Sequence, residues 1–161
     1  MNLLYSLQLD LTMEITWKQL SFEQLSNVDL YKILQLRAAV FIIEQNCIYQ
    51  DLDDKDFKSH HVCAYSGNDL VAYTRVLPAG LSYEEVSIGR VVTSVKARGK
   101  GIGKLLMEKS IETAYALFGN VDIKISAQFY LLKFYQSLGF VEQGEVYLED
   151  NIEHIQMVKL A

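Results

Sequence analysis

The chain has 161 residues, of which 50% are hydrophobic or aromatic and 22% are charged, with a formal net charge of −5. This length and composition predict one soluble domain with a continuous core, not a disordered or fibrous chain. The acidic balance argues against binding of nucleic acid or of an anionic membrane surface. Cys47 and Cys63 are the only thiols. They lack CxxC spacing and clustered histidines, so we expect two reduced, buried cysteines and no metal.

The first twelve residues are moderately apolar, yet they lack the basic start of a signal peptide and the length of a membrane span. Met13 precedes a run that is typical of a first strand. We therefore treat residues 1–12 as an extension and residues 13–161 as one domain. No repeat, low-complexity run or Gly/Ser linker interrupts this domain. A cytoplasmic location is the expectation.

The spacing of apolar residues predicts a mixed α/β sheet flanked by helices. The expected elements are a strand over 14–20, a helix from 21–29 to near Ile43, hairpin strands over 61–65 and 70–77, a strand over 87–93, a helix after 98–104, a strand over 121–125, a helix over 128–138, and strands over 140–147 and 154–160. Gly139 stands where a C-terminal helix cap belongs. Residues 47–59 carry four aspartates among few apolar residues, which is typical of a solvated loop.

The strongest local signal is a glycine-rich segment between a predicted strand and a predicted amphipathic helix. Glycines let successive backbone N–H groups converge on one anion, and the helix start adds unpaired donors and partial positive charge. This pattern predicts a pyrophosphate cradle formed by Arg98, Gly99, Lys100, Gly101, Ile102, Gly103 and Lys104. Leu105 excludes a P-loop, and Lys104 replaces the third Rossmann glycine. Taken alone, the segment is equally compatible with a flexible surface turn.

A second motif decides between these interpretations. Arg98-x-x-Gly101-x-Gly103 followed by Phe134-Tyr135-x-x-x-Gly139-Phe140 resembles the two cofactor motifs of the GNAT acetyltransferase superfamily. Segments 36–45, 49–53 and 88–91 resemble its ElaA-like branch, and the similarity runs from about Met13 to the C-terminus. Departures from the superfamily pattern are Gln128 and Leu131 in place of a common asparagine and alanine, and Val95 in place of a common proline.

The resemblance implies the GNAT acyl-CoA N-acyltransferase fold and direct transfer of an acetyl group from acetyl-CoA to a primary amine of a small molecule or peptide. It implies pantetheine contacts at Val91, Val92 and Thr93, an oxyanion-stabilising N–H near Val92, and a cofactor contact at Gln128. Tyr135 is the expected acid that protonates the leaving thiolate. The alternative role for Tyr135 is that of an aromatic core residue.

The general base stays open between Glu44, His61 and the loop of Asp51 and Asp53. We choose Glu44 first, because a strand histidine or a polar-loop aspartate is more often structural. The superfamily arrangement places four further residues at the acceptor pocket: Arg37, Phe41, Gln45 and Tyr49. Arg37 either binds a substrate carboxylate or pairs with Glu44.

Two other functions compete with the enzyme. One is a non-catalytic acyl-CoA-binding regulatory module that kept the glycine loop. The presence of Tyr135 argues against such a module. The other is a protein-interaction domain in which Tyr and Leu patches form the contact; binding of CoA in competing salt would exclude it. A homodimer is compatible with each of these functions.

Overall fold

The computed structural model describes residues 13–161, so the extension predicted over 1–12 lies outside the described residues. A seven-stranded sheet forms its centre, with the strand order β1-β2-β3-β4-β5-β7-β6. The strands are β1 Thr16–Ser21, β2 His60–Ser66, β3 Asp69–Leu77, β4 Val86–Thr93, β5 Ile123–Gln128, β6 Val141–Glu149 and β7 Ile152–Lys159. All neighbours are antiparallel except β4 and β5, which confirms the mixed sheet.

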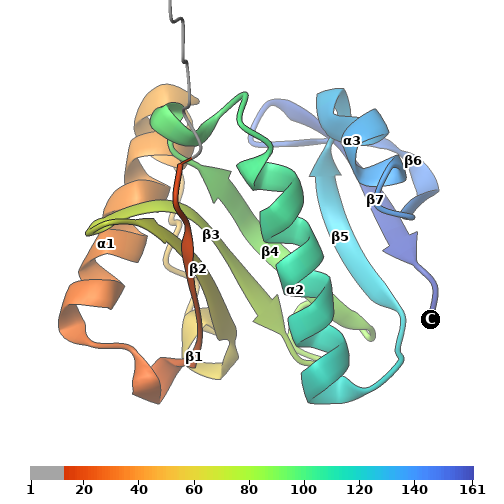
Figure 1. Ribbon diagram of the computed structural model, residues 1–161. Coiled ribbons are helices and arrows are strands. Elements are labelled where there is room, and N and C mark those ends of the chain that lie inside the picture. The colour runs from red at the N-terminus through yellow and green to blue at the C-terminus, as the bar shows by residue number, and fades with distance from the viewer. Residues whose placement is uncertain (1–12) are drawn as a thin grey trace, which may run out of the picture.

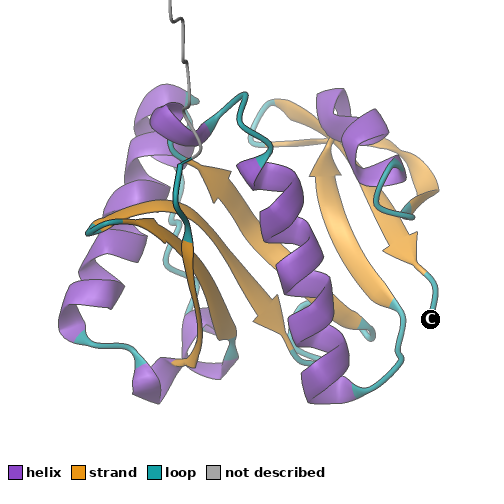
Figure 2. Ribbon diagram, viewed as in Figure 1, coloured by secondary structure: helices purple, strands orange, loops and turns teal. Residues whose placement is uncertain are grey.

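Helices cover both faces of this sheet (Figures 1 and 2). They are α1 Asn27–Arg37, α2 Ile102–Phe118 and α3 Leu132–Gln136, with a π-helical turn η2 Ala38–Glu44 that continues α1. Short 3-10 turns are η1 Phe22–Gln24, η3 Lys55–Lys58, η4 Val95–Ala97 and η5 Phe129–Leu131. This order of helices and strands is the predicted one.

The larger core lies between α2 and the sheet. Val62 of β2 and Val76 of β3 are fully buried there, together with Leu106 and Met107 of α2. Full burial of an aliphatic side chain stabilises the fold by about 1.5 to 3 kcal/mol. Alternate residues of β2 and β3 point away from α2, because successive side chains of a strand face opposite sides.

On the opposite face, α1 packs over β3 and β4. Ser26 caps α1, because its hydroxyl accepts a hydrogen bond from the Asp29 N–H at 3.0 Å. Ile33 of α1, Tyr73 of β3 and Val92 of β4 form a second, smaller core. The helical backbone continues as far as Glu44, close to the predicted end near Ile43.

Strands β4 and β5 begin as neighbours and then diverge. Val86 pairs with Ile123 and Ser87 with Lys124, and no further pairs follow. Figure 1 shows the two strands separating toward the end of the sheet where α2 begins. The β3–β4 register shifts opposite Arg90, which has a φ of 53°. This β-bulge reverses the alternation of side chains, so that Ile88 faces the α2 core whereas Val92 faces the α1 core.

Candidate active site

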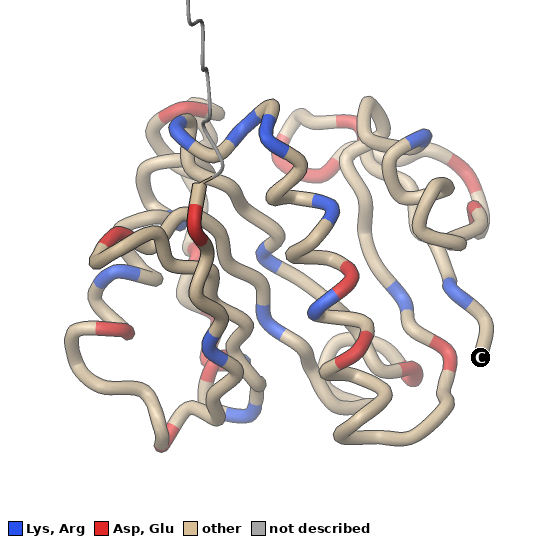
Figure 3. Tube along the Cα trace, viewed as in Figure 1, with Lys and Arg blue, Asp and Glu red and all other residues tan. Residues whose placement is uncertain are grey.

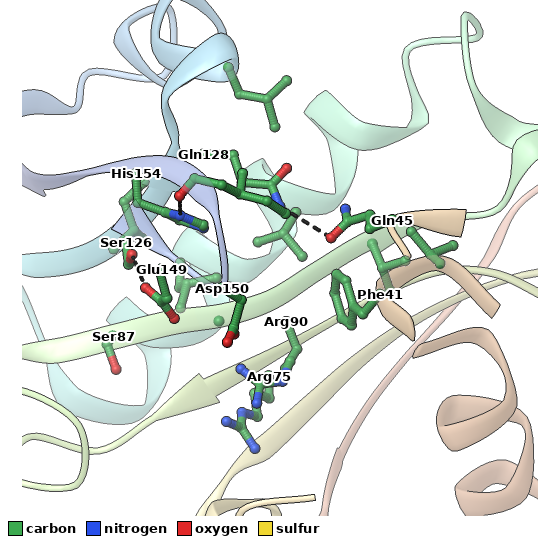
Figure 4. Close-up of a pocket in the computed structure, with 18 of the residues that line it drawn as sticks. Phe41, Gln45, Arg75, Ser87, Arg90, Ser126, Gln128, Glu149, Asp150 and His154 are labelled. Carbon is green, nitrogen blue, oxygen red and sulfur yellow. Dashed lines mark hydrogen bonds between the residues drawn. The ribbon is translucent and has the colours of Figure 1, made fainter. Parts of the chain in front are cut away.

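The divergence of β4 and β5 opens a cleft of about 820 Å³. One wall is the β4 segment from Ser87 to Thr93, and the other includes Ser126 and Gln128 of β5. Figure 4 shows this cleft with the β6–β7 turn at one side and the end of the α1 segment at the other. The residues predicted to contact the pantetheine, Val91, Val92 and Thr93, all line it, as does Gln128, a further predicted cofactor contact.

The glycine-rich segment closes one end of the cleft. Gly99 and Gly101 have φ values of 73° and 76°, which a residue without Cβ adopts at little cost. The N–H groups of Lys104 and Leu105 both bond to the Gly101 carbonyl, at 3.1 and 3.2 Å. The N–H groups that precede them at the start of α2 have no helical acceptor, which is the arrangement that binds anions.

Charge and spacing support the same interpretation of this loop. Figure 3 shows basic residues along the loop that enters α2 and in its first turns. A Cβ on Gly103 would meet Thr93 Cγ2 at 3.7 Å, so the helix start lies against the end of β4. The side chain of Ile102 is buried in the α2 core, which leaves only its backbone for a phosphate. The segment therefore has the backbone geometry of a phosphate cradle.

Tyr135 of α3 reaches the same cleft. Its ring packs edge-on against Phe134 and Phe140, with centroid distances of 5.0 and 6.1 Å. Burial raises the pKa of Tyr135, so its hydroxyl keeps its proton at neutral pH. Tyr135 is thus an aromatic core residue, 5% exposed, that lines the cleft and carries a protonated hydroxyl.

A family model described as "Acetyltransferase (GNAT) domain" matches residues 23–161. The chain belongs to the GNAT acetyltransferase family. Protein ElaA of Escherichia coli is 43% identical over 147 residues, which are 90% of this chain and 96% of that protein. The crystal structure of E. coli ElaA superposes with a TM-score of 0.86 at 42% identity. The crystal structure of an acyl-CoA N-acyltransferase from Pseudomonas aeruginosa superposes with a TM-score of 0.87 at 40% identity. Each of the two superpositions covers 91% of this chain and 99% of the other.

In this GNAT domain, Glu44 forms an ion pair with Arg98 of the glycine-rich segment. Arg98 Nη1 donates to Glu44 Oε1 at 2.7 Å and Arg98 Nη2 to Glu44 Oε2 at 3.0 Å. Arg98 Nη2 also donates to the Thr93 carbonyl at 3.2 Å. Both carboxylate oxygens of Glu44 are therefore engaged, which weighs against our first choice of base.

The expectation of a solvated aspartate loop is wrong for this GNAT domain. Asp51 and Asp56 are buried and pair with Arg37, whose Nε is 2.8 Å from Asp51 Oδ2 and whose Nη1 is 2.8 Å from Asp56 Oδ1. Arg75 bonds Asp53 and Asp56, at 2.6 to 2.9 Å. The aspartates of the loop and the arginines of α1 and β3 thus form one buried ionic network.

Arg37 is placed differently from either prediction. Its side chain is fully buried in this network, pairs with aspartates instead of Glu44, and does not line the cleft. Tyr49, Phe41 and Gln45 do line the cleft, as predicted for acceptor-side residues. The Tyr49 hydroxyl donates to Asp51 Oδ1 at 3.1 Å, and burial raises the pKa of Tyr49 to about 12. Gln45 accepts a hydrogen bond from Gln128 at 3.3 Å across the cleft (Figure 4).

His61 also lies outside the cleft. It is fully buried, with Nδ1 2.8 Å from the Tyr73 hydroxyl and Nε2 3.1 Å from the Asp56 carbonyl oxygen. The role of His61 in the structure is therefore to support the ionic network under the cleft, and it has no path to an acceptor amine.

Acidification is expected to destabilise the fold in two stages. Burial lowers the pKa of His61 below its usual 6.5, so the unfolded chain takes up that proton first and the free energy of unfolding declines below about pH 6.5. For Asp53 and Asp56, burial raises the carboxyl pKa, but hydrogen bonds and ion pairs with the arginines lower it by more. The pKa values of both aspartates therefore lie below the usual 3.8. Their stabilisation is complete above about pH 5 and is lost progressively as the pH falls below that value.

Urea unfolding across a pH series measures both stages. His61→Gln should remove the decline that begins near pH 6.5 and leave the later one unchanged. A wild-type stability that stays constant from about pH 8 to about pH 5 would contradict the neutral, buried state of His61.

Among the lining residues that escaped the sequence analysis are Ser126, Glu149, Asp150 and His154. They come from β5, the β6–β7 turn and β7, and no local motif links them. The acidic turn was predicted as a connection between strands, but its position at the cleft depends on the pairing of β7 with β5. Arg75 and Arg90 are further cleft residues that the sequence did not indicate.

Within residues 13–161 no helix is long and apolar enough to cross a membrane, and no group of three His, Cys, Asp or Glu side chains is placed to hold a metal ion. Cys47 and Cys63 are buried and free, as predicted. The Cys47 thiol lies 3.6 Å from the Asp150 carbonyl oxygen, so the loop after η2 contacts the β6–β7 turn at the cleft.

Proposed function

We propose that this chain is a cytoplasmic, acetyl-CoA-dependent N-acetyltransferase that acts on a primary amine of a small molecule or peptide. The observation that carries the proposal is the cleft between diverging β4 and β5, which joins an anion-binding helix start to a protonated tyrosine. The name of the P. aeruginosa relative, an acyl-CoA N-acyltransferase, supports the acyl donor and the nitrogen acceptor.

In this proposal the glycine loop binds the pyrophosphate through its backbone N–H groups, and the pantetheine follows β4 along Val91 to Thr93. A neutral amine attacks the thioester carbon, and a backbone N–H near Val92 stabilises the oxyanion. The C–S bond breaks with its electron pair on sulfur. Tyr135 then donates its phenolic proton to the thiolate.

Tyr135→Phe is expected to preserve binding of acetyl-CoA and to lower kcat by about 100-fold, the lower range for loss of a general acid. Activity is not abolished, because a thiolate is a good leaving group. Tyr115→Phe on α2, outside the cleft, is the matched control and should leave kcat unchanged. If Tyr135→Phe turns over at the wild-type rate, the role of Tyr135 is confined to packing.

Calorimetric titration with acetyl-CoA and CoA, followed by thiol release with a panel of amines, amino acids and peptides, tests the function itself. Binding together with amine-dependent thiol release is the expected result. Binding without release for every acceptor would favour the non-catalytic acyl-CoA-binding module. Absence of binding would favour the protein-interaction domain.

A further inference from the structure

His154 lies on the side of the cleft that β5 and β7 form. It lies on β7, paired with Gln128 of β5 on one side and with Tyr147 of β6 on the other. Directly paired residues share a face of an antiparallel sheet. These three side chains therefore point to the face that forms the cleft, and Gln128 and His154 line it. Figure 4 shows His154 beside Gln128, Ser126 and Glu149.

One hydrogen bond determines the tautomer of His154. Its Nδ1 is 2.8 Å from the carbonyl oxygen of Ile152. A carbonyl oxygen only accepts hydrogen bonds, so Nδ1 carries the hydrogen and donates it. The neutral ring then keeps its lone pair on Nε2, the nitrogen that is free to accept a proton. The contact with Ile152 also holds the ring in place, as such contacts do for catalytic histidines.

The surroundings of His154 favour a cation. The titratable groups around it include Tyr147 and Glu149 on β6, Asp150 in the turn and Tyr83 ahead of β4, whereas β5 presents the uncharged Ser126 and Gln128. Ser126 donates to Glu149 Oε2 at 3.2 Å, which places this carboxylate at the cleft wall. On the facing wall, Asp51 offsets the charge of Arg90 at 2.7 Å and Asp53 that of Arg75 at 2.6 Å, which leaves Lys55 as the remaining cation of that wall. The His154 side of the cleft therefore offers net negative charge to a ligand.

The candidate bases that the sequence indicated, Glu44, His61, Asp51 and Asp53, are already engaged in other contacts. Both oxygens of Glu44 bond to Arg98, and His61 is fully buried. Asp51 is buried against arginines, and Asp53 accepts two hydrogen bonds from Arg75. Of the three histidines in the chain, His154 is the one that lines the cleft.

We propose that Nε2 of His154 is the base that removes a proton from a cationic primary amine bound beside Glu149. This inference rests on the proposed acetyltransferase function. The ammonium loses one proton to Nε2, and the free amine forms the C–N bond as the C–S bond breaks. Tyr135 protonates the thiolate, and the second proton lost from nitrogen restores the phenol. The proton on His154 leaves to solvent, which gives amide, CoA thiol and one H⁺.

Kinetics with the most active amine of the panel test the role of His154. His154→Gln should lower kcat/KM by about 10² to 10⁴-fold and leave the affinity for acetyl-CoA unchanged. The wild-type kcat/KM should rise about tenfold per pH unit on its acidic limb, and this limb should be absent from His154→Gln. Imidazole should partly restore the rate of His154→Ala. His60→Gln, on β2 outside the cleft, is the control. It should retain the wild-type kcat/KM and the acidic limb of the pH profile.

Ring ¹⁵N NMR of the wild-type protein gives a readout that needs no turnover. In the uncharged form of the His154 ring, the hydrogen is expected on Nδ1. A hydrogen on Nε2 would overturn the proposal, as would an unchanged pH profile in His154→Gln. If the wild-type protein releases no thiol with any amine, the result contradicts the proposed acetyltransferase function and not the assignment of His154. The NMR tautomer then decides separately whether His154 has a free Nε2.

Discussion

Replacement of Gly101 by glutamate should weaken binding of acetyl-CoA and CoA by at least about 100-fold, which corresponds to about 2.7 kcal/mol. Gly101 is the N-cap of α2, where unpaired N–H groups and the helix dipole favour a phosphate. A glutamate there places a negative charge where the pyrophosphate would bind. A Cβ at this position meets no atom within 4 Å, so the loss would not come from a clash with the core. Calorimetry of both ligands measures the effect.

Gly67→Glu is the matched control for this experiment. Gly67 lies in the β2–β3 turn with a φ of 57°, and a Cβ there also meets nothing within 4 Å. The substitution adds the same charge and a similar backbone strain away from the cleft, so affinity should be unchanged. If Gly101→Glu binds CoA as tightly as Gly67→Glu does, the loop does not hold the phosphates.

Arg37→Leu should lower the free energy of unfolding by about 3 to 5 kcal/mol, the usual cost of breaking a buried ion pair from one side. The arginine is fully buried and donates to Asp51 and Asp56. After its removal the network keeps three carboxylates but only two guanidinium groups, so it buries an uncompensated negative charge. Chemical denaturation at neutral pH, followed by circular dichroism, measures the loss.

Arg98→Leu serves as the control for stability. Arg98 also pairs with a carboxylate, but this ion pair is about two-fifths exposed on both sides. Its loss should cost less than about 1 kcal/mol, because solvent screens exposed pairs. Equal losses in the two variants would mean that burial does not make the Arg37 pairs more important than a surface pair.

The ionic network matters to the cleft because it reaches the β-bulge. Arg90 has a left-handed φ, a conformation that costs a residue with a Cβ about 1 to 3 kcal/mol. Its Nε bonds Asp51 Oδ1 at 2.7 Å and its Nη2 bonds the Asp51 carbonyl at 3.0 Å. These contacts hold the bulge that places Ile88 and Val92 on opposite faces of the sheet. The loop of residues 47–59 thus shapes the β4 wall and also lines the cleft itself through Tyr49.

The amino-acid sequence by itself determined the order of strands and helices, the glycine loop and the family. These features depend on residues close together in the chain: an alternation within a strand, Gly101 before a helix, or Tyr135 four residues before Gly139. Backbone preference and the burial of one face act over such short distances, so a local pattern is sufficient to predict them.

Only the tertiary structure decided which charges meet and which histidine reaches the cleft. Arg37 lies 14 residues from Asp51, and Arg90 lies 39 residues from it, so nothing local in the sequence joins them. The aspartate loop was predicted to be solvated because polarity is the local signal, whereas its burial depends on arginines supplied by α1, β3 and β4. His154 lines the cleft because β7 pairs with β5 and β6, and such long-range pairing leaves no short pattern in the chain.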